Sequence, residues 1–99
     1  MELFKMAKEA MSMRSKLKEM EKALKSKIID VNYKNIIVTI NAKSEVVNIK
    51  LPEDIMQKSV SDVEKLLVSA MQEAVKKSQE VMAEESKKFM GGMNIPGLN

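Results

Sequence analysis

Residues 28–52, IIDVNYKNIIVTINAKSEVVNIKLP, decide the fold of this 99-residue chain. β-branched residues crowd this stretch and apolar side chains recur with a period of two, which is the pattern of β-strands. Two polar breaks divide the stretch into three strands. At the first break, Lys34 and Asn35 fit a two-residue turn, in which an asparagine tolerates positive φ. The stretch therefore predicts three consecutive antiparallel strands.

The positions of the two turns predict which residues face each other. In the first hairpin the expected pairs are Tyr33–Ile36, Val31–Val38 and Ile29–Ile40. A loop at residues 42–45 makes the pairs of the second hairpin Ile40–Val47, Val38–Ile49 and Ile36–Leu51. All nine side chains then share one apolar face. A shift of the register by one residue would bury polar residues in their place, so the apolar pattern favours this register. The opposite face is mainly polar but also carries Ile28, Ile37 and Val46.

A helix is expected before the strands, at about residues 2–26. Apolar residues alternate there at spacings of three and four, which produces a continuous apolar seam along one side of a helix. The seam consists of Leu3, Met6, Ala10, Met13, Leu17, Met20 and Leu24. Its methionines are best explained as packing residues.

A second helix is expected after the strands. Pro52 ends the third strand, a helical turn is expected at residues 53–58, and Ser61-Asp62-Val63-Glu64 has the form of a capping box. The apolar stripe continues to Phe89, and Gly91 and Gly92 stop the helix. The fold class is therefore α+β, ordered α-β-β-β-α, with a single domain at residues 1–90 and a mobile Gly/Pro tail at residues 91–99.

The lengths of these elements predict a homodimer. Helices of about 25 residues extend roughly 37 Å, whereas strands of about six residues span only about 20 Å. Much of each helix must then project beyond the sheet, and a projecting apolar stripe is costly in water unless a second copy covers it. The residues expected at the interface between the two copies are Leu3, Phe4, Ala7, Met11, Ile37 and Val46.

The composition excludes most catalytic and cofactor-dependent functions. The chain has no cysteine and no histidine, so it offers no thiolate nucleophile, no imidazole base and no nitrogen or sulfur metal ligand. We expect a non-enzymatic protein without cofactor, metal or small-molecule substrate. No apolar run is long enough to cross a bilayer, so we also expect a cytoplasmic protein that does not enter membranes.

The charge is unevenly distributed along the chain. Residues 1–27 hold eight basic and four acidic side chains, whereas residues 52–99 hold six and eight. An array of lysines on the first helix could neutralise phosphates and release counterions, although a solvated helix face would look similar. The candidate DNA contacts on the first helix are Lys5, Lys8, Arg14, Lys16, Lys18, Lys22 and Lys25, and those on the second helix are Lys76, Lys77, Lys87 and Lys88.

The chain resembles the YbaB/EbfC family of bacterial nucleoid-associated DNA-binding proteins. The resemblance is most specific in residues 36–41, in the turn at residues 43–45 and in residues 46–52. The alanine-spaced second helix at residues 67–77 and the Pro-Gly ending at residues 91–98 are also similar. The first turn, Tyr33-Lys34-Asn35, departs from the glycine-rich turn usual in the family.

This resemblance implies a homodimer with projecting helical arms that is associated with the nucleoid and binds double-stranded DNA with little base selectivity. The low content of arginine and aromatic residues agrees with contacts to the DNA backbone rather than to bases. An alternative function is a protein-binding adaptor or secretion-type chaperone that uses Met-rich apolar surfaces. A third, attachment of the basic first helix to a membrane surface, conflicts with the use of its seam in packing.

Overall fold

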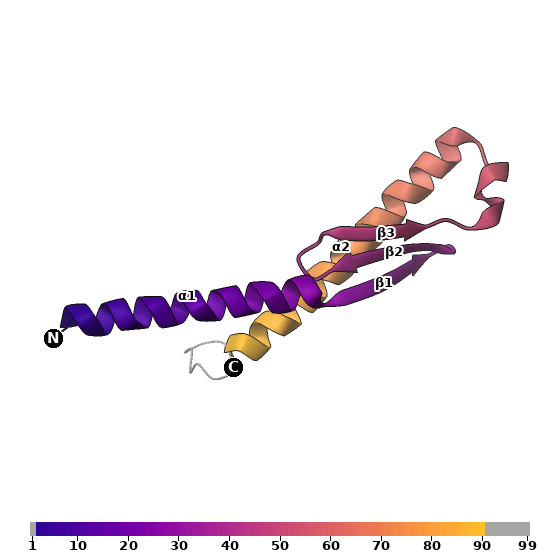
Figure 1. The fold of residues 1–99 in the computed structure, drawn as a ribbon. Coiled ribbons are helices and arrows are strands. Elements are labelled where there is room, and N and C mark those ends of the chain that lie inside the picture. Colours follow the sequence, from indigo (N-terminus) through magenta and orange to yellow (C-terminus); the bar gives the residue numbers. More distant parts are fainter. Residues whose placement is uncertain (1, 91–99) are drawn as a thin grey trace.

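The computed structural model describes residues 2–90, and the tail predicted at residues 91–99 lies outside this range together with the two glycines expected to stop the second helix. The predicted order α-β-β-β-α is confirmed, with a short 3-10 helix between the last strand and the second long helix (Figure 1). The elements are α1 Glu2–Ser26, β1 Ile28–Tyr33, β2 Ile36–Asn41, β3 Val46–Lys50, η1 Glu53–Gln57 and α2 Val60–Met90.

The first hairpin has the predicted turn and register. Lys34 and Asn35 both adopt positive φ, 49° and 70°, as a tight hairpin turn requires. The Asn35 amide donates a 3.0 Å hydrogen bond to the side-chain oxygen of Asn32. The antiparallel pairs are those expected, namely Ile29–Ile40, Val31–Val38 and Tyr33–Ile36.

The second hairpin contains a β-bulge that the sequence analysis did not predict. Val38 faces Ile49 as expected, but Ile40 faces Val46 and not Val47. The loop explains the shift, because the Asn41 amide donates to the Glu45 carbonyl at 3.0 Å and thereby starts a pairing one residue out of step with the rest of the sheet. Cross-strand partners point to the same side of a sheet. Val46 therefore points to the same side as Ile40, and its predicted place on the mainly polar face was wrong.

One face of the sheet is covered by α2, which packs on β1 and β2. Ile36, Val38 and Ile40 of β2 are fully buried, and two small residues of α2, Ala70 and Ala74, allow the helix to approach them closely. Ile55 of η1 closes one end of this core. The core therefore lies between α2 and the central strand.

The third strand and the residue that follows it carry apolar side chains that their own chain leaves exposed. Val47, Ile49 and Leu51 were predicted on the apolar face, yet they remain 59%, 40% and 42% exposed. The reason is geometric, since a helix is about 10 Å wide and strands lie about 4.8 Å apart, so one helix shields only about two strands. The predicted nine-residue face is thus only partly covered.

The first helix projects from the sheet as an arm (Figure 1). Only its last turns are packed, where Leu24 is buried, whereas Leu3 is 83% exposed and Leu17 53%. The molecule measures 70 × 25 × 18 Å, and its radius of gyration of 19.4 Å exceeds the roughly 13 Å of a compact domain of this length. The predicted overhang of the apolar seam is confirmed.

The start of α2 differs from the prediction. Ser59, and not Ser61, caps the helix, because its hydroxyl accepts a 3.1 Å hydrogen bond from the Asp62 amide. The Ser59 carbonyl also accepts the Val63 amide at 3.0 Å. Ser59 and Ser61 are both residues that can cap the start of this helix, and the structure uses Ser59.

Candidate nucleic-acid interface

The base of the α1 arm is anchored to the loop between β2 and β3. The Ala42 amide lies 3.1 Å from both the Leu24 and the Lys27 carbonyl oxygens. It therefore donates to a carbonyl group that has no partner within the last turn of the helix. The ammonium of Lys43 donates a 2.8 Å hydrogen bond to Glu21. These contacts fix the direction in which the arm leaves the sheet.

The same loop is tied to α2 through a buried serine. Ser78 is 0% exposed, and its hydroxyl donates to the Asn41 carbonyl at 2.8 Å. Its oxygen lies 2.9 Å from the hydroxyl of Ser44, which has a positive φ of 63°. In the sequence, Ser78 stands within the apolar stripe of the second helix. In the structure this serine joins α2 to the loop that holds the arm.

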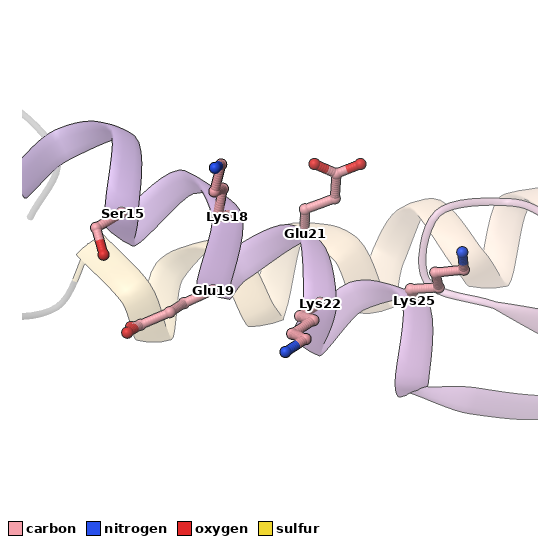
Figure 2. Close-up of a pocket in the computed structure, with 6 residues that line it drawn as sticks. All are labelled: Ser15, Lys18, Glu19, Glu21, Lys22 and Lys25. Atoms are coloured by element: carbon pink, nitrogen blue, oxygen red, sulfur yellow. The ribbon is translucent and has the colours of Figure 1, made fainter. Parts of the chain in front are cut away.

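Four basic residues of α1 form a row on one side of the arm. Arg14, Lys18, Lys22 and Lys25 follow one another at spacings of four, four and three residues, which places them on one helix face over about 16 Å. All four are exposed. Figure 2 shows Lys18, Lys22 and Lys25 along the visible side of α1, with Glu21 at one edge and Glu19 at the other. We call these four residues the basic row.

Glu21 competes little for the charges of the basic row because it is bonded to Lys43. That hydrogen bond lowers the pKa of Glu21, with smaller contributions from the charges of Lys43 and Lys25. The same bond raises the pKa of Lys43. Among residues 2–90, none of the four members of the row takes part in an ion pair. Its positive charge is therefore available to an anion in solution.

The other predicted DNA contacts are more dispersed. Lys5 and Lys8 are exposed farther out on α1, and Lys16 is exposed between Arg14 and Lys18. The helical period turns Lys5 and Lys16 toward a different flank. On α2, Lys77 lies 3.7 Å from Glu80 and Lys88 lies 3.2 Å from Glu85. The remaining candidates, Lys76 and Lys87, are exposed on the side of α2 that faces away from the sheet.

The predicted apolar interface residues fall into two separate groups. Leu3, Phe4, Ala7 and Met11 are exposed on the arm, whereas Ile37 is half-buried in the sheet and Val46 is 41% exposed at the bulge. The single chain does not bring the two groups together. Val47, Ile49 and Leu51 were not predicted as interface candidates, because their alternation placed them on the apolar face of the sheet.

These features define a small binding protein with an exposed apolar sheet face and an arm that presents unneutralised cations to a polyanion. The sequence pattern of the YbaB/EbfC DNA-binding family matches residues 1–93, and the chain belongs to this family. This is the family that residues 36–52 were found to resemble. Within residues 2–90, no helix has the length and apolar character needed to cross a bilayer.

Relatives of the chain carry names that agree with the family. The chain is 32% identical over 96 residues to a nucleoid-associated protein of Thermoanaerobacter pseudethanolicus, an alignment that covers 94% of this chain and 86% of the relative. It is 43% identical over 47 residues to a nucleoid-associated protein of Desulforamulus reducens and 40% identical over 47 residues to one of Clostridium botulinum. These two alignments cover 48% of this chain and 45% and 42% of the relatives.

Proposed function

We propose that the protein is a dimeric, nucleoid-associated protein that binds the phosphate backbone of double-stranded DNA with little base selectivity. The observation that carries this proposal is the basic row, four exposed cations without ion-pair partners in residues 2–90 on one side of a projecting arm. Such an array neutralises phosphates and releases condensed counterions, which is the main source of sequence-independent affinity. The family and the names of the relatives support the same function and location.

The composition supports binding to the backbone and argues against catalysis. One arginine, one tyrosine, two phenylalanines and no tryptophan leave few groups for bidentate guanine contacts or base stacking. The absence of histidine and cysteine from the sequence removes the commonest general bases and nucleophiles. The lysines outside the row, on other flanks of α1 and on α2, are further candidate contacts.

The dimer follows from apolar surface that one chain leaves exposed. The α2-facing side of β3 and the seam of α1 are both uncovered, and Leu17, Val46 and Ile49 are 53%, 41% and 40% exposed. A second copy offers the same surfaces in return and buries them symmetrically. Two copies also double the number of basic rows that one stretch of DNA meets.

The test of DNA binding is a fluorescence-anisotropy titration of labelled duplexes across a salt series. Replacing Lys18 and Lys22 by glutamine should lower the slope of log affinity against log salt by about 1.8 for each basic row in contact, since each lost phosphate contact removes about 0.9. The charge-matched control, Lys27→Gln with Lys50→Gln, should keep the wild-type slope. Equal slopes in all three proteins would refute the role of the row, and no complex with any duplex at low salt would refute the function.

The dimer is tested by sedimentation equilibrium at micromolar concentration. Wild type should sediment at twice the chain mass of 11.2 kDa. Ile49→Glu should dissociate the dimer, because it places a charge in the apolar face of β3. Asn48→Glu puts the same charge on the other face of the strand, opposite Thr39, and should leave the dimer intact. A wild-type protein of 11.2 kDa under these conditions would exclude the dimer.

A further inference from the structure

A second group of basic residues lies at the end of the sheet that is farthest from the arm. Three lysines from three segments surround Tyr33: Lys34 in the turn between β1 and β2, Lys58 between η1 and α2, and Lys65 on α2. They line a depression of about 330 Å³ together with Asp62 and Ser69. β1 separates this distal basic pocket from the base of α1 by about 20 Å.

The pocket has an excess of positive charge that the protein does not neutralise. The residues that line it include three lysines and one acidic residue, Asp62. In the part of the chain that the structure describes, the ion pairs involve other lysines, and none includes Lys34, Lys58 or Lys65. The ammonium of Lys34 lies 5.6 Å from the centre of the Tyr33 ring, a cation–π distance that holds it at the rim. Lysines without ion-pair partners that line one depression suit an oxyanion with several negative oxygens.

The backbone holds one of these cations in place at an energetic cost. Lys34 has a φ of 49°, in the left-handed region that favours glycine or asparagine and costs other residues about 1 kcal/mol or more. The tight turn is braced by the hydrogen bond from Asn35 to Asn32. The turn therefore fixes the point from which the Lys34 side chain reaches the rim of the pocket.

We propose that the distal basic pocket is a second phosphate-binding site, which takes a backbone phosphate of a nucleic-acid segment separate from the one bound by the basic row. The inference rests on the proposed DNA binding and adds a second contact to it. The arm α1 leaves one end of the sheet and the turn between β1 and β2 lies at the other end (Figure 1). The row belongs to α1 and Lys34 to that turn, so one protomer holds nucleic acid at two distant points. Those two points can belong to two duplexes or to two parts of one bent duplex.

The first test compares salt slopes in variants of equal charge. Lys34→Gln with Lys65→Gln should lower the slope of log affinity against log salt by about 1.8. Raising the salt from about 50 to about 200 mM should then weaken the affinity of the variant about tenfold less than it weakens that of the wild type. Lys27→Gln with Lys50→Gln removes the same charge elsewhere and should leave the slope unchanged. A wild-type slope in the Lys34/Lys65 variant overturns the second site while the row remains supported. Failure of wild type to bind any duplex refutes the proposed function itself.

The second test uses Tyr33 as a built-in probe. It is the only tyrosine in a chain without tryptophan, so its fluorescence reports on this pocket alone. Titration with inorganic tripolyphosphate should change the Tyr33 emission saturably in wild type and not in the Lys34/Lys65 variant. No saturable change in wild type overturns the site. Saturable tripolyphosphate binding together with an unchanged DNA salt slope identifies a free-phosphate pocket and overturns the assignment to nucleic acid.

Discussion

Replacing Ser78 by alanine should weaken the junction that holds the arm. The serine hydroxyl has one proton, which goes to the Asn41 carbonyl at 2.8 Å, so the Ser44 hydroxyl donates to Ser78. Both bonds disappear in the variant. The loss is limited because the Asn41 carbonyl keeps the Ser44 amide at 3.0 Å, and the Ser44 side chain is only half-buried and can turn to water.

The expected cost follows from these contacts. A buried hydrogen bond contributes about 0.5–1.5 kcal/mol, and the better helix propensity of alanine returns a few tenths. The free energy of unfolding should therefore fall by about 1 kcal/mol, which corresponds to roughly 4–8 °C in melting temperature for a domain of this size. Urea unfolding followed by circular dichroism measures this difference. The protein concentration must be equal for all variants, since a dimer is stabilised by concentration.

Ser86 provides the matched control for this substitution. It also lies on α2 and is partly buried, but within residues 2–90 its side chain forms no hydrogen bond. Ser86→Ala should be neutral or slightly stabilising. If Ser78→Ala were equally neutral, the hydrogen bonds between α2 and the loop would not contribute to stability and the account of the anchored arm would be wrong.

Four further substitutions test three other parts of the structure. Glu21→Gln should lower the urea midpoint at pH 7 but not in acid, because a carboxylate whose pKa is lowered by Lys43 loses its stabilising effect as the pH falls through that lowered pKa. Ala74→Leu should cost about 1–3 kcal/mol in thermal unfolding, since the residue is fully buried between α2 and the sheet. Ser59→Ala should cost about 1 kcal/mol and Ser61→Ala little in urea unfolding, and the reverse order would restore the cap predicted from the sequence.

The local pattern was sufficient to predict the elements and the first hairpin. The positions of Lys34 and Asn35 set the register of β1 and β2, because a two-residue turn leaves only one way to align apolar alternation on both strands. The second hairpin was predicted one residue out at its loop end. There the side chain of Asn41 accepts the amides of Lys43 and Glu45 and organises the loop, a contact that the alternation of apolar residues does not encode.

The candidate site was predicted in part. The sequence identified Arg14, Lys18, Lys22 and Lys25 as candidate DNA contacts but did not single them out as one row, and composition indicated backbone contacts. The bond between Glu21 and Lys43 was not predicted, since the two residues are 22 positions apart and meet only because the loop folds back on α1. The distal basic pocket was missed for the same reason, as its lysines are spread from Lys34 to Lys65.

The sequence by itself determined the helices, the strands, the projecting arm and the charge of its surface, because each depends on a period or a spacing within one segment. Only the tertiary structure decided which apolar surface stays open and which cations stand together. A single helix can cover only part of a three-stranded sheet, so β3 remains exposed although its pattern matches that of the buried central strand. Burial depends on what packs against a residue from elsewhere in the chain, and that information is not contained in the periodicity of one segment.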